Sequence, residues 1–175
     1  EVERAINVLD GAVLAVSGVE GIEAQTYTIW NALKEKKVPT IFFINKMDRD
    51  GADYEAVLKE LKEKLEVPVI SLEKVEKKGK EVIVSKLSKD EIIEQLSSVE
   101  SGVDDIIESY LEDPSSISDE KLNKRIEELS QKGIINIVIG GSALKSIGTK
   151  ELVHYISKCL PESKRDLSKD FSAYV

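Results

Sequence analysis

Residues 39–48 read Pro-Thr-Ile-Phe-Phe-Ile-Asn-Lys-Met-Asp, and this stretch decides the fold. Its first six residues form a continuous apolar, β-rich run, which is typical of a strand buried on both faces of a parallel sheet. Its last four, Asn45 to Asp48, follow at the carboxyl end of that strand, where open α/β sheets bind their ligands. By chance, about 2 in 100 chains of this length would carry the tetrapeptide somewhere. Its position directly after a buried strand therefore favours a binding role over a chance occurrence.

The residue types in this loop suit a guanine base. An ionised Asp48 carries only acceptors, so it can bind the N1–H and the exocyclic 2-amino group of guanine bidentately. Adenine offers neither donor in that place, so a buried Asp48 would be left unpaired and would reject it. We expect the aliphatic stem of Lys46 to lie along the ring face and Asn45 to tie neighbouring loops together.

Other apolar runs predict the companions of this strand. Residues 12–16 and 134–139 are each continuously apolar and are expected to form buried strands. Helical patterns are expected over about 22–37 and 148–160, and residues 1–9 resemble the end of an amphipathic helix. Strand and helix alternate between residues 12 and 65, which indicates βαβ units. The predicted fold class is therefore α/β, with parallel strands flanked by helices.

A second candidate binding loop follows the strand at 134–139 and reads Gly140-Gly141-Ser142-Ala143. Its small residues would let the backbone approach a flat ligand, and the Ala143 amide could donate to a purine 6-oxo group. We expect Leu144 to cover the ring face opposite Lys46, while Lys145 faces either the nucleoside or the solvent. Gly-Ser-Ala after a strand is by itself more often a simple turn. Its combination with Asn45–Asp48 on the same sheet favours a purine site.

The middle of the chain follows a different pattern. Residues 67–72 predict a short strand, which Pro68 confines to a sheet edge or a strand start. Residues 73–80 are interpreted as a charged turn and 81–85 as an exposed hairpin strand. The remaining helices of this region are expected at 89–96, 103–111 and 118–131. We therefore predict a mostly helical insertion over residues 72–132.

Composition indicates a globular chain, with 41% hydrophobic and 33% charged residues. The net charge of −8 argues against a broad nucleic-acid surface. The absence of an apolar run near ~20 residues and of a signal peptide predicts a cytoplasmic protein without a membrane partner. The single Cys159 excludes an internal disulfide. We expect Trp30 to have a packing role, Cys159 to be core-facing or inert, and His154 to have a structural or surface role. No residue is assigned to catalysis or to a metal.

The two candidate loops together resemble the last two signatures of GTP-binding domains. Residues 19–26 resemble the segment that follows the fourth strand of translational GTPases. Residues 45–54 are similar to elongation factor G, and residues 141–148 are similar to the tetracycline-resistance ribosomal protection proteins. The resemblance spans nearly the whole chain. It implies the C-terminal part of a G domain over 1–71 and 133–162, with the insertion at 72–132 and a linker that starts a β-barrel domain at 163–175.

This resemblance implies a parent protein that binds and hydrolyses GTP on the ribosome, in translation or in antibiotic resistance. The 175 residues hold no Gly-x-x-x-x-Gly-Lys-[Ser/Thr] phosphate loop. They also lack the family's first-switch Thr and its Asp-x-x-Gly segment. We therefore expect Mg²⁺ and hydrolysis only in the intact parent, and nucleotide binding here of roughly millimolar strength, on the order of 4 kcal/mol. A circularly permuted GTPase is a weaker possibility, because its phosphate loop should follow the Ser142 region.

Two further expectations concern partners. In the family's fold, the strand at 12–16 has a neighbour that these residues do not supply. Its apolar edge would therefore be open to self-association. The alternative function is a non-enzymatic α/β interaction module, in which the signatures are loop scaffolding and the insertion at 72–132 binds a partner.

Overall fold

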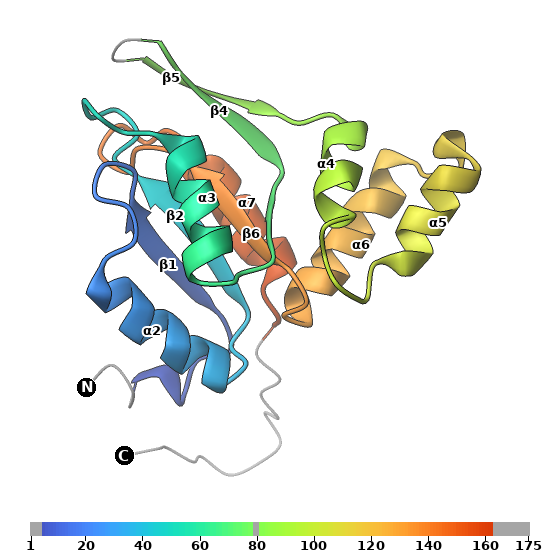
Figure 1. The fold of residues 1–175 in the computed structure, drawn as a ribbon, viewed down its shortest axis with the longest axis horizontal. Helices are drawn as coiled ribbons and strands as arrows, with labels where there is room; N and C mark the ends of the chain where they lie inside the picture. Colours follow the sequence, from blue (N-terminus) through green and yellow to red (C-terminus); the bar gives the residue numbers. More distant parts are fainter. Residues whose placement is uncertain (1–4, 79–80, 163–175) are drawn as a thin grey trace.

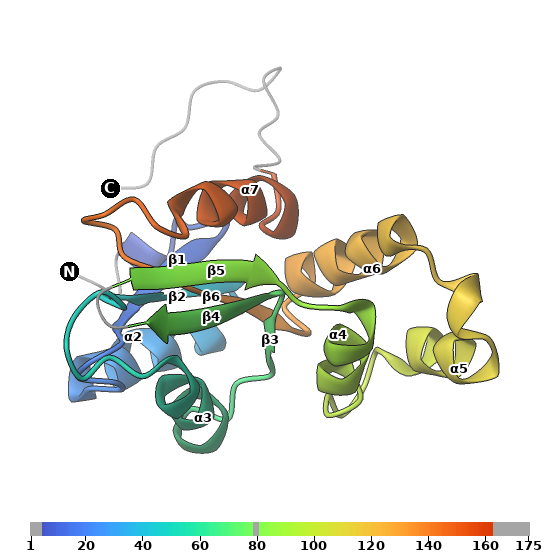
Figure 2. The same ribbon diagram turned by 90° about the horizontal axis from the view of Figure 1, so that it is seen from above.

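The computed structural model describes residues 5–78 and 81–162, and its centre is a four-stranded parallel sheet (Figure 1). The strand order is β1 (Ala12–Ser17), β2 (Thr40–Asn45), β6 (Asn136–Gly140) and β3 (Val69–Ser71). Helices α2 (Ala24–Glu35) and α3 (Tyr54–Lys64) lie on one side of the sheet, and α7 (Thr149–Cys159) lies on the other (Figure 2). The predicted α/β class with parallel strands flanked by helices is confirmed.

Strand β2 lies inside the sheet, and all but its last residue are buried. On one face, Trp30 of α2 packs against Phe42 with ring centroids 5.2 Å apart. The indole N–H of Trp30 donates to the carbonyl of Leu65 at 3.3 Å, so the polar end of this buried side chain is satisfied. The expected structural role of Trp30 is confirmed.

Strand β1 is an edge strand of the sheet, as expected, but it differs from its prediction because it is buried on only one face. Leu14 and Val16 are buried, whereas Val13 is 40% exposed and Ala15 is also exposed. On the face of the sheet opposite to α2 and α3, a hydrophobic cluster packs against β2, β6 and β3. No residue of β1 belongs to this cluster. The expectation of a fully buried strand at 12–16 is therefore wrong, since no element covers the second face of β1 within the described chain.

Residues 73–78 are not the expected charged turn, and residues 79–80 lie outside the described residues. Strand β4 (Glu73–Lys78) pairs antiparallel with β5 (Glu81–Lys86), with Val75 opposite Val84. Val75, Val82 and Val84 pack against the same hydrophobic cluster as α2 and α3. The prediction failed because this run is dominated by charged residues, which are also common in turns. Successive side chains of a strand point to opposite faces, so Val75 can face the core while its charged neighbours face solvent. The expected hairpin strand at 81–85 is confirmed.

Three helices follow the hairpin, at the expected places: α4 (Lys89–Leu96), α5 (Asp104–Glu112) and α6 (Asp119–Gln131). A short 3₁₀ helix, η1 (Pro114–Ser116), joins the last two. Ser88 and Ser118 cap α4 and α6 by accepting backbone N–H bonds of 3.3 and 3.2 Å. Leu96 and Leu129 are fully buried in the cluster that covers the second face of the sheet. The inserted helices therefore share one core with the sheet.

Helix α7 completes this face with Cys159, which is 1% exposed. Burial raises the pKa of its thiol to about 12, so the group is a neutral, inert part of the core, as expected. His154 on the same helix is exposed. Across the described ranges, no helix has both the length and the apolar character to span a bilayer.

Candidate functional site

Three loops meet at the carboxyl edge of the sheet. We call them the Gly18 loop (residues 18–23), the Asn45 loop (45–53) and the Ser142 loop (141–148). Strand pairing aligns their starting points, because Ser17 lies opposite Asn45 and Ile44 lies opposite Gly140. Adjacent parallel strands thus deliver the three loops to the same edge, which the sequence predicted for the Asn45 and Ser142 loops.

Main-chain hydrogen bonds join the three loops. The Gly18 N–H donates to the carbonyl of Asn45 at 2.7 Å. The Met47 N–H donates to the carbonyl of Gly141 at 3.0 Å, and the Gly141 N–H donates to the carbonyl of Ile44 at 2.9 Å. The relative positions of the loops are therefore fixed by backbone atoms and depend little on side-chain rotamers.

The side chain of Asn45 adds a further link. Its Oδ1 accepts from its neighbour Lys46 N–H at 2.8 Å and from Ala143 N–H at 2.9 Å, 98 residues away in sequence. Asn45 therefore ties the Asn45 loop to the Ser142 loop. The Ala143 amide, expected to face a purine oxygen, is directed to Asn45 in this structure. A purine 6-oxo group would have to share or replace this bond.

Lys46 turns the chain sharply at the end of β2. Its backbone is left-handed, with φ of 63°, and the next side chain, Met47, is 2% exposed beneath the loops. The Lys46 ammonium lies 3.3 Å from a carboxylate oxygen of Glu20, and this ion pair is about half-exposed. Sequence reasoning assigned no role to Glu20 or Met47. For Met47, the signal available in the sequence was an apolar residue in an otherwise polar loop.

Asp48 is the most enclosed charged group at this edge, with its side chain only 8% exposed. The Lys145 ammonium lies 3.7 Å from its carboxylate. Hydrogen bonding from Ser142 holds the pKa of Asp48 below its usual value, and the charges of Lys145 and Arg49 act in the same direction. Asp48 is thus an ionised, acceptor-only group that is held between two loops.

The Ser142 loop is closed by a short bridge. Ser142 N–H donates to the carbonyl of Ile147 at 3.0 Å, and Ile147 N–H donates back at 2.9 Å. Ser142 is 1% exposed, whereas Leu144 at the tip of the loop is 81% exposed. Gly148, with φ of 73°, then begins α7. The bridge holds Ser142 beneath Asp48 and leaves Leu144 at the surface.

A hollow of about 460 Å³ opens beside these loops, lined by Val19, Glu20, Lys46, Arg49 and Asp50. Within the two ranges that the structure describes, no cluster of His, Cys, Asp or Glu could hold a metal ion. The edge therefore offers one enclosed carboxylate, the Ala143 amide that Asn45 now binds, and an open space beside them. Such a set can recognise the hydrogen-bonding edge of a flat polar ligand.

The description of one protein family fits this arrangement. Residues 1–162 match the family model of the elongation factor Tu GTP-binding domain. The chain belongs to this family. It is a partial G domain of the translational GTPase superfamily, a family that binds guanine nucleotides. The match includes both the candidate loops and the insertion, so it does not favour the alternative of a non-enzymatic interaction module.

Curated relatives of this G domain include tetracycline resistance proteins and elongation factor G. TetP of Clostridium perfringens is 33% identical over 181 residues, covering 100% of this chain and 27% of that protein. TetO of Campylobacter jejuni is 37% identical over 172 residues, covering 95% of this chain and 26% of that protein. Elongation factor G of Chlamydia caviae is 32% identical over 197 residues, covering 94% and 28%. The chain spans about a quarter of the length of these relatives.

A crystal structure of a Thermus thermophilus protein has the same fold, with a TM-score of 0.69. The matched region is 22% identical and covers 92% of this chain and 28% of the Thermus thermophilus protein. The recognition of a translational GTPase from the two loop signatures is confirmed. Short motifs in the sequence were sufficient for this assignment.

Proposed function

We propose that the Gly18, Asn45 and Ser142 loops hold the guanine base of GTP or GDP in a ribosome-associated translational GTPase. The observation that supports this most is the state of Asp48. It is enclosed, ionised and fixed by the neighbouring Ser142 loop. An acceptor pair held in this way suits the two adjacent donors of guanine, N1–H and the 2-amino group.

The surrounding residues have supporting roles in this proposal. The stem of Lys46 and the exposed Leu144 cover opposite faces of the base. Asn45 keeps the loops together, and the Ala143 amide turns from Asn45 to the purine 6-oxo group when the base enters. Lys145 must move off Asp48, which its half-exposed side chain permits.

The rest of the nucleotide lies beyond these contacts. The 175 residues contain no phosphate-loop sequence, and no described group of ligands fits Mg²⁺. We propose that phosphate binding, Mg²⁺ and hydrolysis belong to the whole protein, whose work on the ribosome is that of a ribosomal protection protein or of elongation factor G. Residues 1–71 and 133–162 are its G-domain part, and 72–132 are its insertion. Residues 163–175, which lie outside the described residues, are proposed as a linker and the start of a β-barrel domain. We place the whole protein in the cytoplasm.

The proposal is tested by following backbone amide shifts of the isotopically labelled chain during separate titrations with GDP and ADP. We expect shifts confined to the three loops with GDP alone, at roughly millimolar Kd. The Asp48→Asn variant should lose GDP and gain the xanthine nucleotide, because an Asn amide can donate to the 2-oxo group of xanthine. We expect about 10- to 100-fold changes, the value of one or two charge-assisted hydrogen bonds.

Asp10→Asn is the control, since it removes an exposed carboxylate at the opposite edge of the sheet, before β1. It should leave both titrations unchanged. Equal shifts with GDP and ADP, or an Asp48→Asn variant that behaves as the wild type, would contradict the proposal.

We also propose that the chain self-associates through the outer edge of β1. The Ala12 N–H donates to the carbonyl of Pro39, so the N–H groups of Val13 and Ala15 point to the outer edge. No strand of the described residues pairs there. An unpaired edge of this kind is a template for another strand.

Ala15→Pro removes one outward donor without touching the ladder to β2, whereas Ala15→Val keeps the donor. Sedimentation velocity should show weaker association for Ala15→Pro than for Ala15→Val. A wild-type chain that stays monomeric at high concentration would refute the proposal.

A further inference from the structure

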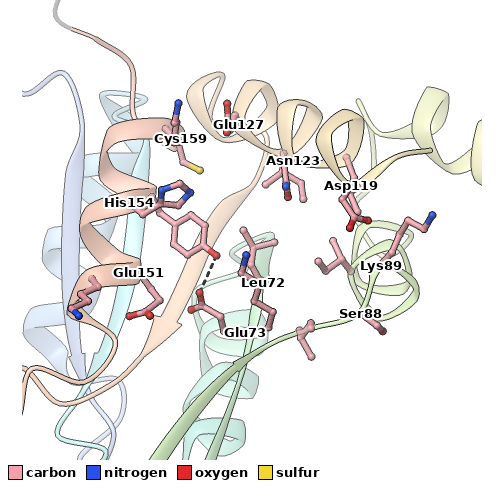
Figure 3. Close-up of a pocket in the computed structure, with 18 residues that line it drawn as sticks. Leu72, Glu73, Ser88, Lys89, Asp119, Asn123, Glu127, Glu151, His154 and Cys159 are labelled. Atoms are coloured by element: carbon pink, nitrogen blue, oxygen red, sulfur yellow. Dashed lines mark hydrogen bonds between the residues drawn. The ribbon is translucent and has the colours of Figure 1, made fainter. Parts of the chain in front are cut away.

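A second cavity, of about 640 Å³, lies away from the nucleotide loops (Figure 3). It is enclosed by the start of β4, the end of β5, and helices α4, α6 and α7. In Figure 3, Leu72 and Glu73 lie between the side chains of α7 and those of α4 and α6. The cavity thus forms where the insertion meets the last helix.

Glu73 is the unusual residue of this cavity. It is 3% exposed, although it carries a carboxyl group. One oxygen, Oε1, accepts from the Tyr155 hydroxyl at 2.9 Å, and the other, Oε2, is buried without a hydrogen-bond partner among the described residues. Buried carboxyl oxygens are normally paired, since an unmade bond costs about 1–3 kcal/mol. The orphan oxygen belongs to a residue that lines a cavity large enough for a ligand.

The charges near Glu73 define the kind of partner that is missing. Burial raises its pKa, and the neighbouring carboxylate of Glu151 on α7 raises it further, against the hydrogen bond from Tyr155 and the charge of Lys86. Another cation of the lining, Lys89, already donates to the carbonyls of Pro114 and Ile117 at 3.1 and 2.8 Å. A positively charged donor between Glu73 and Glu151 would satisfy the orphan oxygen and reduce the repulsion between the two acids.

The remaining wall is mixed: it holds an apolar part beside polar and charged side chains that include Asp119, Lys150 and Lys158. Leu72, Ile92, Leu122 and Ile126 line the cavity, and each is at least nine-tenths buried. An aliphatic or aromatic body of several carbons could therefore lie against them while its charged end reaches Glu73. Apolar contact supplies most of the affinity in such pockets, and a few polar groups fix the orientation.

We propose that this cavity binds an organic cation, with an ammonium or guanidinium group on Glu73 beside Glu151 and an apolar body against Leu72 and Ile126. The cation belongs either to a free amine or to a Lys or Arg side chain of a protein. This site is independent of the guanine site and does not rest on that proposal.

Methyl and amide shifts of the labelled chain test the proposal during titration with hexylammonium, hexanol and hexanoate at constant ionic strength. We expect hexylammonium to shift residues of the cavity wall with a Kd at least tenfold below that of hexanol, and hexanoate to be inert. N-acetyl-lysine and N-acetyl-arginine methylamides form the second arm. Binding of these at lower concentration than hexylammonium would identify a protein side chain as the ligand, and the reverse order would identify a free amine.

Two variants separate a built site from non-specific contact. Glu73→Gln keeps the shape and the bond to Tyr155, and it should weaken hexylammonium at least tenfold while hexanol is unchanged. Asn123→Trp fills the cavity from an exposed position of α6 and should abolish both. Glu76→Gln, on the same strand but half-buried and outside the cavity lining, is the control and should change neither.

Equal affinity for hexylammonium and hexanol would overturn the proposal, as would hexylammonium binding that Glu73→Gln leaves unchanged. Shifts spread over the acidic surface and lost with added salt would also overturn it, because they would indicate simple charge attraction.

Discussion

Gly141→Ala is the substitution that most directly tests how the Ser142 loop is built. A Cβ at this position would lie 2.1 Å from the carbonyl oxygen of Ile147 and 3.2 Å from the Cα of Gly148. Both are backbone atoms, so no side-chain rotation can relieve the contact. The bridge between Ser142 and Ile147, which closes the loop, must therefore open.

The size of the effect follows from that bridge. The carbonyl of Ile147 would have to move by about 0.9 Å to reach the 3.0 Å that real Cβ contacts keep. This carbonyl accepts from Ser142 at 3.0 Å, and the reciprocal bond is 2.9 Å. Losing two hydrogen bonds at about 1 kcal/mol each, with some residual strain, predicts a loss of about 2–4 kcal/mol in the free energy of unfolding.

Urea unfolding of Gly141→Ala and of Gly133→Ala gives the comparison. Gly133 has φ of 69°, but no heavy atom lies within 4 Å of the place that an alanine methyl group would take, so alanine there meets only the left-handed backbone penalty. That penalty is about 1–2 kcal/mol. GDP titration of both variants completes the assay, and only Gly141→Ala should lose the loop shifts.

The reasoning is refuted if Gly141→Ala unfolds at the same urea concentration as Gly133→Ala and keeps wild-type amide shifts over residues 141–148. These two results together would mean that the bridge between Ser142 and Ile147 does not constrain the loop.

Three more outcomes are expected. Glu73→Gln should raise the urea midpoint more at pH 7 than at pH 4. The pKa of Glu73 is raised in the folded state, so the wild-type protein loses stability as the pH rises above 4.5, the ordinary pKa of this carboxyl group. The pKa of Asp48 is lowered, so its contribution to stability should persist from pH 7 down to its ordinary value of 3.8 and be lost below it, which acid titration of Asp48→Asn against wild type measures. Leu129→Ala, at a fully buried site, should cost about 2–5 kcal/mol in thermal or urea unfolding, whereas Leu111→Ala, at a 76% exposed site, should cost less than about 0.5 kcal/mol.

The sheet and its loops were predictable because their signals are local. The run at 39–44 is apolar throughout, and the polar residues of Asn45–Asp48 follow at once, so strand and loop are read from neighbouring residues. The hairpin was partly missed for the opposite reason. Residues 73–78 are dominated by Glu and Lys, and only the packing of Val75 beside Tyr54 and Gly140 shows which side faces inward.

The sequence by itself determined the fold class, the two loop signatures and the family, because strand periodicity and short motifs depend on residues close together in the chain. Tertiary structure alone decided that β1 is half-exposed, that Asn45 holds the Ala143 amide, and that Glu73 carries an orphan oxygen inside a cavity. Each of these depends on atoms that are distant in sequence, such as Asn45 and Ala143 or Glu73 and Tyr155. Burial and hydrogen bonding between such groups are set by how the elements pack, and no local pattern encodes them.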